Sequence, residues 1–118
     1  MTEEDRTAIN PEVLVLGEVI DRLKREDPAK KLPTGFAHPH SYRGYYEELA
    51  FEVRRDITVG EVLAAAEFAL GKTFQGWKGG DYTMSEYTTC WLVREEGWSG
   101  GETIGAILLE LLLAGEVA

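Results

Sequence analysis

The strongest local signal in the sequence is the start of a helix after Thr58. Thr58 stands three residues before Glu61, the spacing of a reciprocal capping box, and Ile57 and Val62 flank it as a hydrophobic staple would. Gly71 then ends the helical pattern, because glycine readily adopts the left-handed conformation that follows a last helical turn. The predicted inward stripe of this helix contains Val62, Leu63, Ala66, Ala69 and Leu70.

Two further helices and four strands are predicted around this helix. Asn10 and Pro11 are typical of a helix start, and Pro28 requires that helix to end near Glu26. The last helix is predicted from about Glu102 to Ala114, and it is apolar enough to suggest a homodimer seam. Its predicted inward stripe is Ile104, Ile107, Leu108, Leu111 and Leu112. Strands are predicted over residues 45–53, 73–77, 82–84 and 88–94, with residues 31–43 as an irregular connection and residues 54–56 as a turn.

This order of elements predicts an α+β fold. The simplest arrangement is a small antiparallel sheet of three to five strands with about three helices packed mainly on one face. A chain of 118 residues forms one domain at this size. We therefore expect a flexible segment over residues 1–9 and a single domain over residues 10–118.

The charge of the chain limits its partners. The net charge is −9, and residues 44–118 carry 13 acidic and 5 basic side chains. Such a surface repels phosphate backbones, so general nucleic-acid binding is not expected. The apolar runs are too short to span a bilayer, and a single cysteine, Cys90, excludes an internal disulfide. We therefore expect a cytoplasmic protein without membrane contact.

The segment from Thr34 to Tyr46 contains both histidines and three of the five tyrosines. The candidate ligand-binding residues in it offer a planar guanidinium, a hydroxyl, an imidazole and several aromatic faces. They are His40, Ser41, Tyr42, Arg43, Tyr45 and Tyr46. The alternative interpretation is structural: the tyrosines border the core, and Arg43 pairs with an acid to fix a long loop.

The second candidate segment, residues 76–83, combines glycines with aromatic rings and one lysine. Adjacent glycines expose backbone N–H groups to an anion, and rings beside them stack on a planar ligand. Its candidate residues are Trp77, Lys78, Asp81 and Tyr82. The alternative interpretation is a tight hairpin turn at Gly79 and Gly80.

Metal and covalent chemistry receive little support from the sequence. His38 and His40 would point to one side of an extended chain, but no third metal ligand is defined beyond Asp81 or Glu47. We therefore predict no metal and no cofactor. Ser41 and His40 are neighbours in sequence, which rarely gives a nucleophile–base geometry, and Cys90 is expected to be a buried small hydrophobe. No catalytic residue is assigned.

Five segments together resemble a group of small bacteriophage and actinobacterial proteins of unknown function. They are residues 33–36, 39–46 (PHSYRGYY), 49–52, 58–61 and 76–84 (GWKGGDYTM). The resemblance implies a phage-type setting, in which small acidic proteins bind and block host components. It transfers no catalytic residue.

Three functions remain open from the sequence. The first is a non-enzymatic protein that holds an anionic, nucleotide-like ligand between residues 34–46 and 76–83, as a sequestering or counter-defence protein would. The second is an acidic inhibitor or adaptor that binds a host protein through the acidic surface from Tyr45 onward, for which Glu47, Glu48 and Glu52 are the residues to test. The third is a small hydrolase or transferase that uses His40 and Arg43, which is disfavoured because no complete catalytic set is visible.

Overall fold

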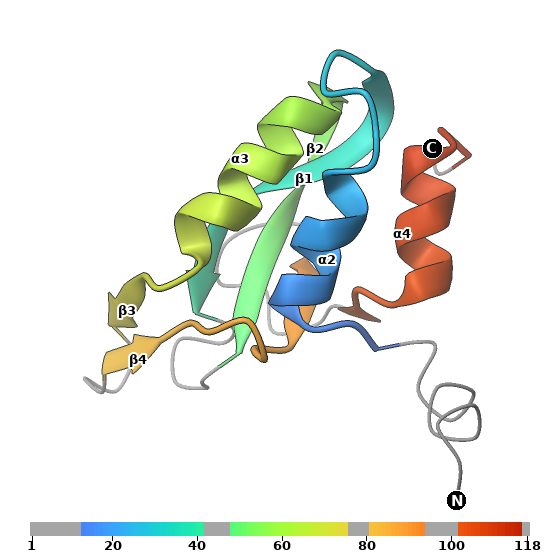
Figure 1. The fold of residues 1–118 in the computed structure, drawn as a ribbon. Helices are drawn as coiled ribbons and strands as arrows, with labels where there is room; N and C mark the ends of the chain where they lie inside the picture. The colour runs from blue at the N-terminus through green and yellow to red at the C-terminus, as the bar shows by residue number, and fades with distance from the viewer. Residues whose placement is uncertain (1–12, 42–47, 76–80, 94–101, 117–118) are drawn as a thin grey trace, which may run out of the picture.

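The protein has an α+β fold, as the sequence predicts. The computed structural model describes residues 13–41, 48–75, 81–93 and 102–116 (Figure 1). Along the chain these residues form α2 (Leu16–Leu23), β1 (Lys31–Ser41), β2 (Leu49–Thr58), α3 (Val59–Ala69), β3 (Thr73–Gln75), β4 (Asp81–Thr83), β5 (Cys90–Val93), β6 (Glu102–Thr103) and α4 (Ala106–Leu113). The expected flexible segment 1–9 and the expected helix start at Asn10 and Pro11 lie outside the described residues.

The main sheet has the order β1-β2-β5-β6 and is mixed rather than purely antiparallel. β1 pairs antiparallel with β2, and β6 with β5, but β2 and β5 run parallel, with Leu49 opposite Cys90 and Glu52 opposite Val93. A parallel pair needs a crossover connection, which here consists of α3 and the separate two-stranded ribbon β3–β4. The predicted sheet was purely antiparallel, so it did not include this parallel pair.

β1 is a strand where the sequence predicted an irregular connection. Pro33 and Pro39 interrupt most strands, but β1 lies at an edge of the sheet, where a residue without an N–H can be accommodated. A bulge interrupts the pairing between Ala37 and His40, so that Phe51 on β2 faces both His38 and Pro39. His38 has a φ of 56°, an uncommon backbone conformation for a residue other than glycine.

β2 continues through the predicted turn and leads directly into α3. Arg54, Arg55 and Asp56 belong to the strand, and Asp56 accommodates the bend with a φ of 54°. The capping box is confirmed: Glu61 N donates to Thr58 Oγ1 at 3.2 Å, and Thr58 N donates to Glu61 Oε1 at 2.9 Å. The Glu61 carboxylate accepts from the Thr58 backbone N–H and, at 3.0 Å, from the Thr58 hydroxyl, and these two bonds, the backbone one first, lower the pKa of Glu61.

α2, α3 and α4 lie on the same side of the sheet (Figure 1). The core that they enclose is centred on Phe36 and Phe51, whose ring centroids are 4.9 Å apart. The buried residues of α3 are Val59, Val62, Ala66 and Ala69. The prediction of Leu70 as a core residue was wrong: it follows the last helical residue and is 45% exposed.

α2 begins later than the sequence predicts. Val15 forms a bridge with Thr89, and Leu14 N donates to Ile104 O at 3.1 Å, so these residues are extended rather than helical. The helix therefore starts at Leu16 and is stabilised by Glu18, whose carboxylate accepts the Val15 N–H at 3.0 Å.

α4 is shorter than predicted, and its buried face is only partly the predicted one. Glu102 and Thr103 form β6, so the helix starts at Ala106. The residues that it buries are Leu109, Leu112 and Leu113, whereas the predicted inward residues Ile107 and Leu111 are 64% and 39% exposed. Two of the predicted inward residues, Leu112 and Ile104 just before the helix, are buried as expected. The exposed Glu110 receives two bonds from the Arg22 guanidinium of α2.

We expect Gly35→Ala to destabilise the protein by about 1–3 kcal/mol, the usual cost of overpacking a close contact. A Cβ at this position would lie 2.5 Å from Ile57 Cγ2 and 3.1 Å from Val62 Cγ2. Urea unfolding measures the change. Gly71→Ala is the matched control, since it has a φ of 79° but nothing within 4 Å, and should cost about 1 kcal/mol from the backbone alone. A smaller loss for Gly35→Ala than for Gly71→Ala would contradict this packing.

The Arg22–Glu110 ion pair should contribute to stability only above acidic pH. Its hydrogen bonds lower the pKa of Glu110 below the ordinary 4.5, so its contribution is fully present above that value and is lost as the pH falls through the folded-state pKa. Because the Glu110 side chain is 54% exposed, we expect at most about 1 kcal/mol. The urea midpoint is measured at pH 6 and at pH 3, which bracket the titration of the carboxyl. The midpoint should change less between these two pH values in Glu110→Gln than in the wild type. Glu116→Gln, an exposed control beyond the same helix, should keep the wild-type pH dependence; loss of that dependence in Glu116→Gln would contradict the assignment.

Candidate functional site

On the sheet face opposite the helices, three basic side chains lie close to one buried carboxylate, that of Glu52. Glu52 alternates with the core residue Phe51, and it is only 7% exposed. Arg54 Nη1 lies 3.0 Å from Glu52 Oε1, while His38 Nε2 and His40 Nε2 lie 3.5 Å and 3.7 Å from Oε2. We call these four residues the Glu52 cluster.

The bulge in β1 brings the two imidazoles to one carboxylate. The extra residue re-aims the side chains of the strand, as bulges do, and leaves the ring centroids of His38 and His40 5.7 Å apart. The sequence suggested that both rings would share a side, and both approach Glu52 Oε2. Asp81 or Glu47 was the acid predicted beside the two histidines. Glu52 was not predicted, because the pairing of β1 with β2 is not visible in the sequence.

His40 is hydrogen-bonded at one edge of its ring, and its other edge lies near Glu52. Its Nδ1 lies 3.2 Å from the carbonyl oxygen of Ser41, and because a carbonyl only accepts, Nδ1 carries the hydrogen of this bond. Its Nε2 is buried and has no hydrogen-bond partner among the described residues. The imidazole therefore links the end of β1 to the Glu52 cluster on β2.

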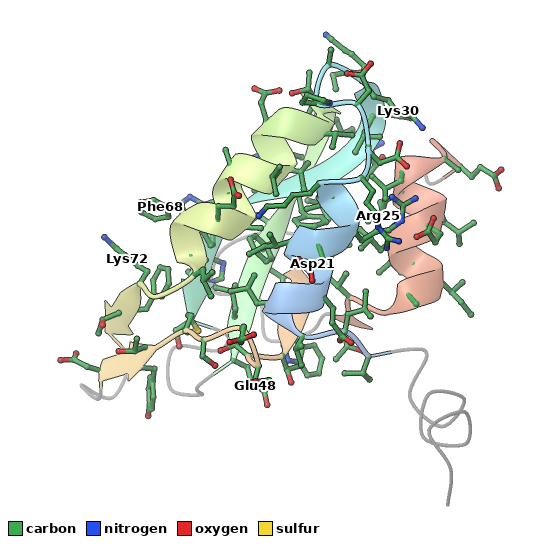
Figure 2. The ribbon with its side chains drawn as sticks, viewed as in Figure 1. Asp21, Arg25, Lys30, Glu48, Phe68 and Lys72 are labelled. Carbon is green, nitrogen blue, oxygen red and sulfur yellow. The ribbon has the colours of Figure 1, made fainter. Side chains whose placement is uncertain are left out.

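Trp91 extends this face to β5. His40, Ala50 and Trp91 are opposite one another on three neighbouring strands. Trp91 Nε1 donates to Glu48 Oε1 at 2.6 Å, and Glu48 lies just before β2 (Figure 2). Ala50 and Val93 are fully or almost fully buried here, in a small core separate from the main one. Trp91 was not among the predicted site residues. The signal for it in the sequence is its position next to the buried Cys90 in a strand, which places the indole on the opposite face of the sheet.

Four of the ten predicted site residues are described by the structure. His40 and the buried Ser41 end β1, whereas Asp81 is exposed on β4. Tyr82 is half-buried opposite Phe74, and both rings pack against the main core, so Tyr82 also has a structural role. The other six predicted residues, Tyr42, Arg43, Tyr45, Tyr46, Trp77 and Lys78, lie outside the described residues.

The two predicted segments start from neighbouring parts of the fold. β1 is in contact with β3, and Figure 1 shows the β3–β4 ribbon at the end of the sheet where β1 finishes. Residues 42–47 continue from Ser41, and residues 76–80 join Gln75 to Asp81. The fold thus places the attachment points of both segments at one end of the molecule.

The described residues limit the chemistry of this site. No group of three His, Cys, Asp or Glu within them is arranged to hold a metal ion. Cys90 is fully buried, and burial raises the pKa of its thiol to about 12, so it is a poor nucleophile.

Glu52 also differs from its predicted role in an acidic surface. It is buried and paired with Arg54, so it is not an exposed charge for a basic partner. Glu48 accepts a hydrogen bond from Trp91, and Glu47 lies outside the described residues. Of the three acids named for an acidic interface, neither of the two described ones is a free surface charge.

None of the helices in the described ranges combines the length and apolar character needed to cross a membrane. Comparison with protein-family models, with curated proteins and with solved structures found no match to this chain.

We expect Glu52→Gln to lower the free energy of unfolding by about 1–3 kcal/mol, because it removes the charged partner of Arg54 in a buried setting. Glu48→Gln is the matched control, since the amide keeps an acceptor oxygen for the Trp91 indole. It should cost less than about 1 kcal/mol, the central value for a hydrogen bond. Urea unfolding of both variants measures the difference. Equal effects would show that Glu52 does not organise this face.

Proposed function

We propose that the protein is a non-enzymatic binding protein that holds a small anionic, nucleotide-like ligand between residues 34–46 and 76–83. The observation that supports this most is the contact between β1 and β3. Because of this contact, the two segments are attached to the fold at the same end of the sheet. Each segment contains aromatic rings and one Lys or Arg.

The cations of the two segments are the natural partners of an anionic group. Arg54, the cation of the Glu52 cluster, already pairs with Glu52. The charge for a ligand would therefore come from Arg43 and Lys78, a planar fork and a compact ammonium that both bind phosphate. Tyrosine and tryptophan rings beside them suit a planar base.

Binding without turnover fits the described residues better than catalysis does. The thiol of Cys90 is buried, and the imidazole of His40 is engaged with Ser41 and Glu52. A nucleophile and base within reach of one another are the minimum for covalent catalysis. The resemblance to small phage proteins extends the proposal to sequestration of a host nucleotide signal.

We expect a panel of nucleotides to include at least one that raises the melting temperature and binds in calorimetry. Arg43→Ala and Lys78→Ala should each weaken that binding about tenfold or more, which is about 1.4 kcal/mol, while urea unfolding stays near wild type. Arg55→Ala is the matched control, because Arg55 is an exposed arginine of β2 opposite Thr34.

Chromatography of the ligand after incubation separates binding from turnover. Recovery of the unchanged nucleotide agrees with the proposal, and conversion would support the enzyme alternative. Folded protein that binds no member of the panel, or binding lost equally in Arg55→Ala, would contradict the proposed function.

A further inference from the structure

We infer that Phe68 and Lys72, at the end of α3, are further ligand-binding residues: the Phe68 ring stacks on the base of the nucleotide, and the Lys72 ammonium pairs with its phosphate. We call these two residues the Phe68–Lys72 pair. The inference rests on the proposed function and deepens it, because neither residue belongs to the two predicted segments.

Phe68 is a large apolar residue on the solvent face of α3. The helix turns Val62, Ala66 and Ala69 inward, whereas Glu61, seven residues before Phe68 and thus on the same face, is exposed. Phe68 is 58% exposed and is not part of the main core. Its ring therefore adds little to the packing of the helix and leaves a planar apolar surface for a partner.

Lys72 holds its ammonium over this ring, with Nζ 4.9 Å from the ring centroid. Within the described ranges no carboxylate lies at ion-pair distance from Lys72, whereas the Lys24 ammonium is 3.8 Å from a Glu67 carboxylate oxygen. The chain has 21 acidic and only 12 basic side chains, so acids to pair with are in excess. The charge of Lys72 is thus available to an anion, and the Phe68 ring stays largely exposed beneath it.

The backbone places this pair at the end of the fold to which the candidate segments are attached. Gly71 N donates to Met84 O at 2.8 Å, and Met84 N donates to Lys72 O at 2.9 Å, so Lys72 is fixed at the base of the β3–β4 ribbon. β3 follows Lys72 directly and contacts β1. Figure 2 shows the Phe68 and Lys72 side chains at the end of α3, beside β3.

A nucleotide is the class of ligand that uses both members of the pair. An aromatic ring stacks on any base, because every base has a flat face, and an ammonium binds phosphate as a point charge. A simple anion would use the ammonium alone, and an apolar ligand would use the ring alone.

The affinity for the tightest-binding nucleotide of the panel tests each member of the pair. We expect Phe68→Leu and Lys72→Gln each to bind about tenfold more weakly than the wild type, because one loses the flat ring and the other the charge. Phe68→Tyr and Lys72→Arg keep these properties and should bind within about twofold of the wild type. All four variants should unfold in urea near the wild-type midpoint, since both side chains are exposed.

Two residues of the same types elsewhere on the surface are the matched controls. Tyr87→Leu removes an exposed ring in the turn between β4 and β5, and Lys24→Gln removes an exposed ammonium just after α2. Both should keep the wild-type affinity. Binding by Phe68→Leu within twofold of the wild type would overturn the inference and leave the proposed function intact. If the wild-type protein binds no nucleotide, the proposed function fails and this inference fails with it.

Proton NMR spectra give a readout that a purely structural role would not change. We expect the base protons of the bound nucleotide to shift upfield with the wild type and Phe68→Tyr, because of the ring current of the stacked side chain, but less with Phe68→Leu. In the free protein, the methylene protons beside the Lys72 ammonium should likewise lose an upfield shift in Phe68→Leu. Base protons that shift equally with the wild type and Phe68→Leu would contradict stacking on Phe68.

Discussion

The pairing of β1 with β2, interrupted by one bulge, is the constraint on which the rest of the structure depends. On the helix side the pairing brings Phe36 and Phe51 together at the centre of the core. On the opposite side it brings His38, His40 and Arg54 around Glu52. A shift of the register by one residue would exchange these two faces and bury the charged cluster under the helices.

The Glu52 cluster includes two histidines of the first candidate segment, residues 34–46. The bulge turns two histidines of an edge strand towards a buried acid, and His40 then meets the carbonyl of the last strand residue. Residues 42–47 follow Ser41 in the chain. In the β3–β4 ribbon, which contacts β1, Phe74 and Tyr82 pack against the core. Binding residues are often carried by loops that a folded scaffold positions.

The features that depend on neighbouring residues could be predicted from the sequence, and those that depend on distant partners could not. The cap at Thr58 and Glu61 and the turn at Gly71 are local, and both are present. The prolines of β1 look like breakers until the strand is known to lie at an edge, which is a property of the whole sheet. The pairing of Glu110 on α4 with Arg22, 88 residues away in sequence, is likewise not visible in the sequence. The carboxylate beside the histidines was missed for the same reason, since Glu52 reaches them only through strand pairing.

We propose that residues 34–46 and 76–83 contribute to one binding site at the end of the sheet. The most direct test of this proposal is a backbone NMR titration of the full chain with the nucleotide that binds most tightly. We expect the amide chemical shifts of both segments to change over the same range of ligand concentration, while those of α4 do not change. Movement confined to one segment, or centred on α4, would contradict the account.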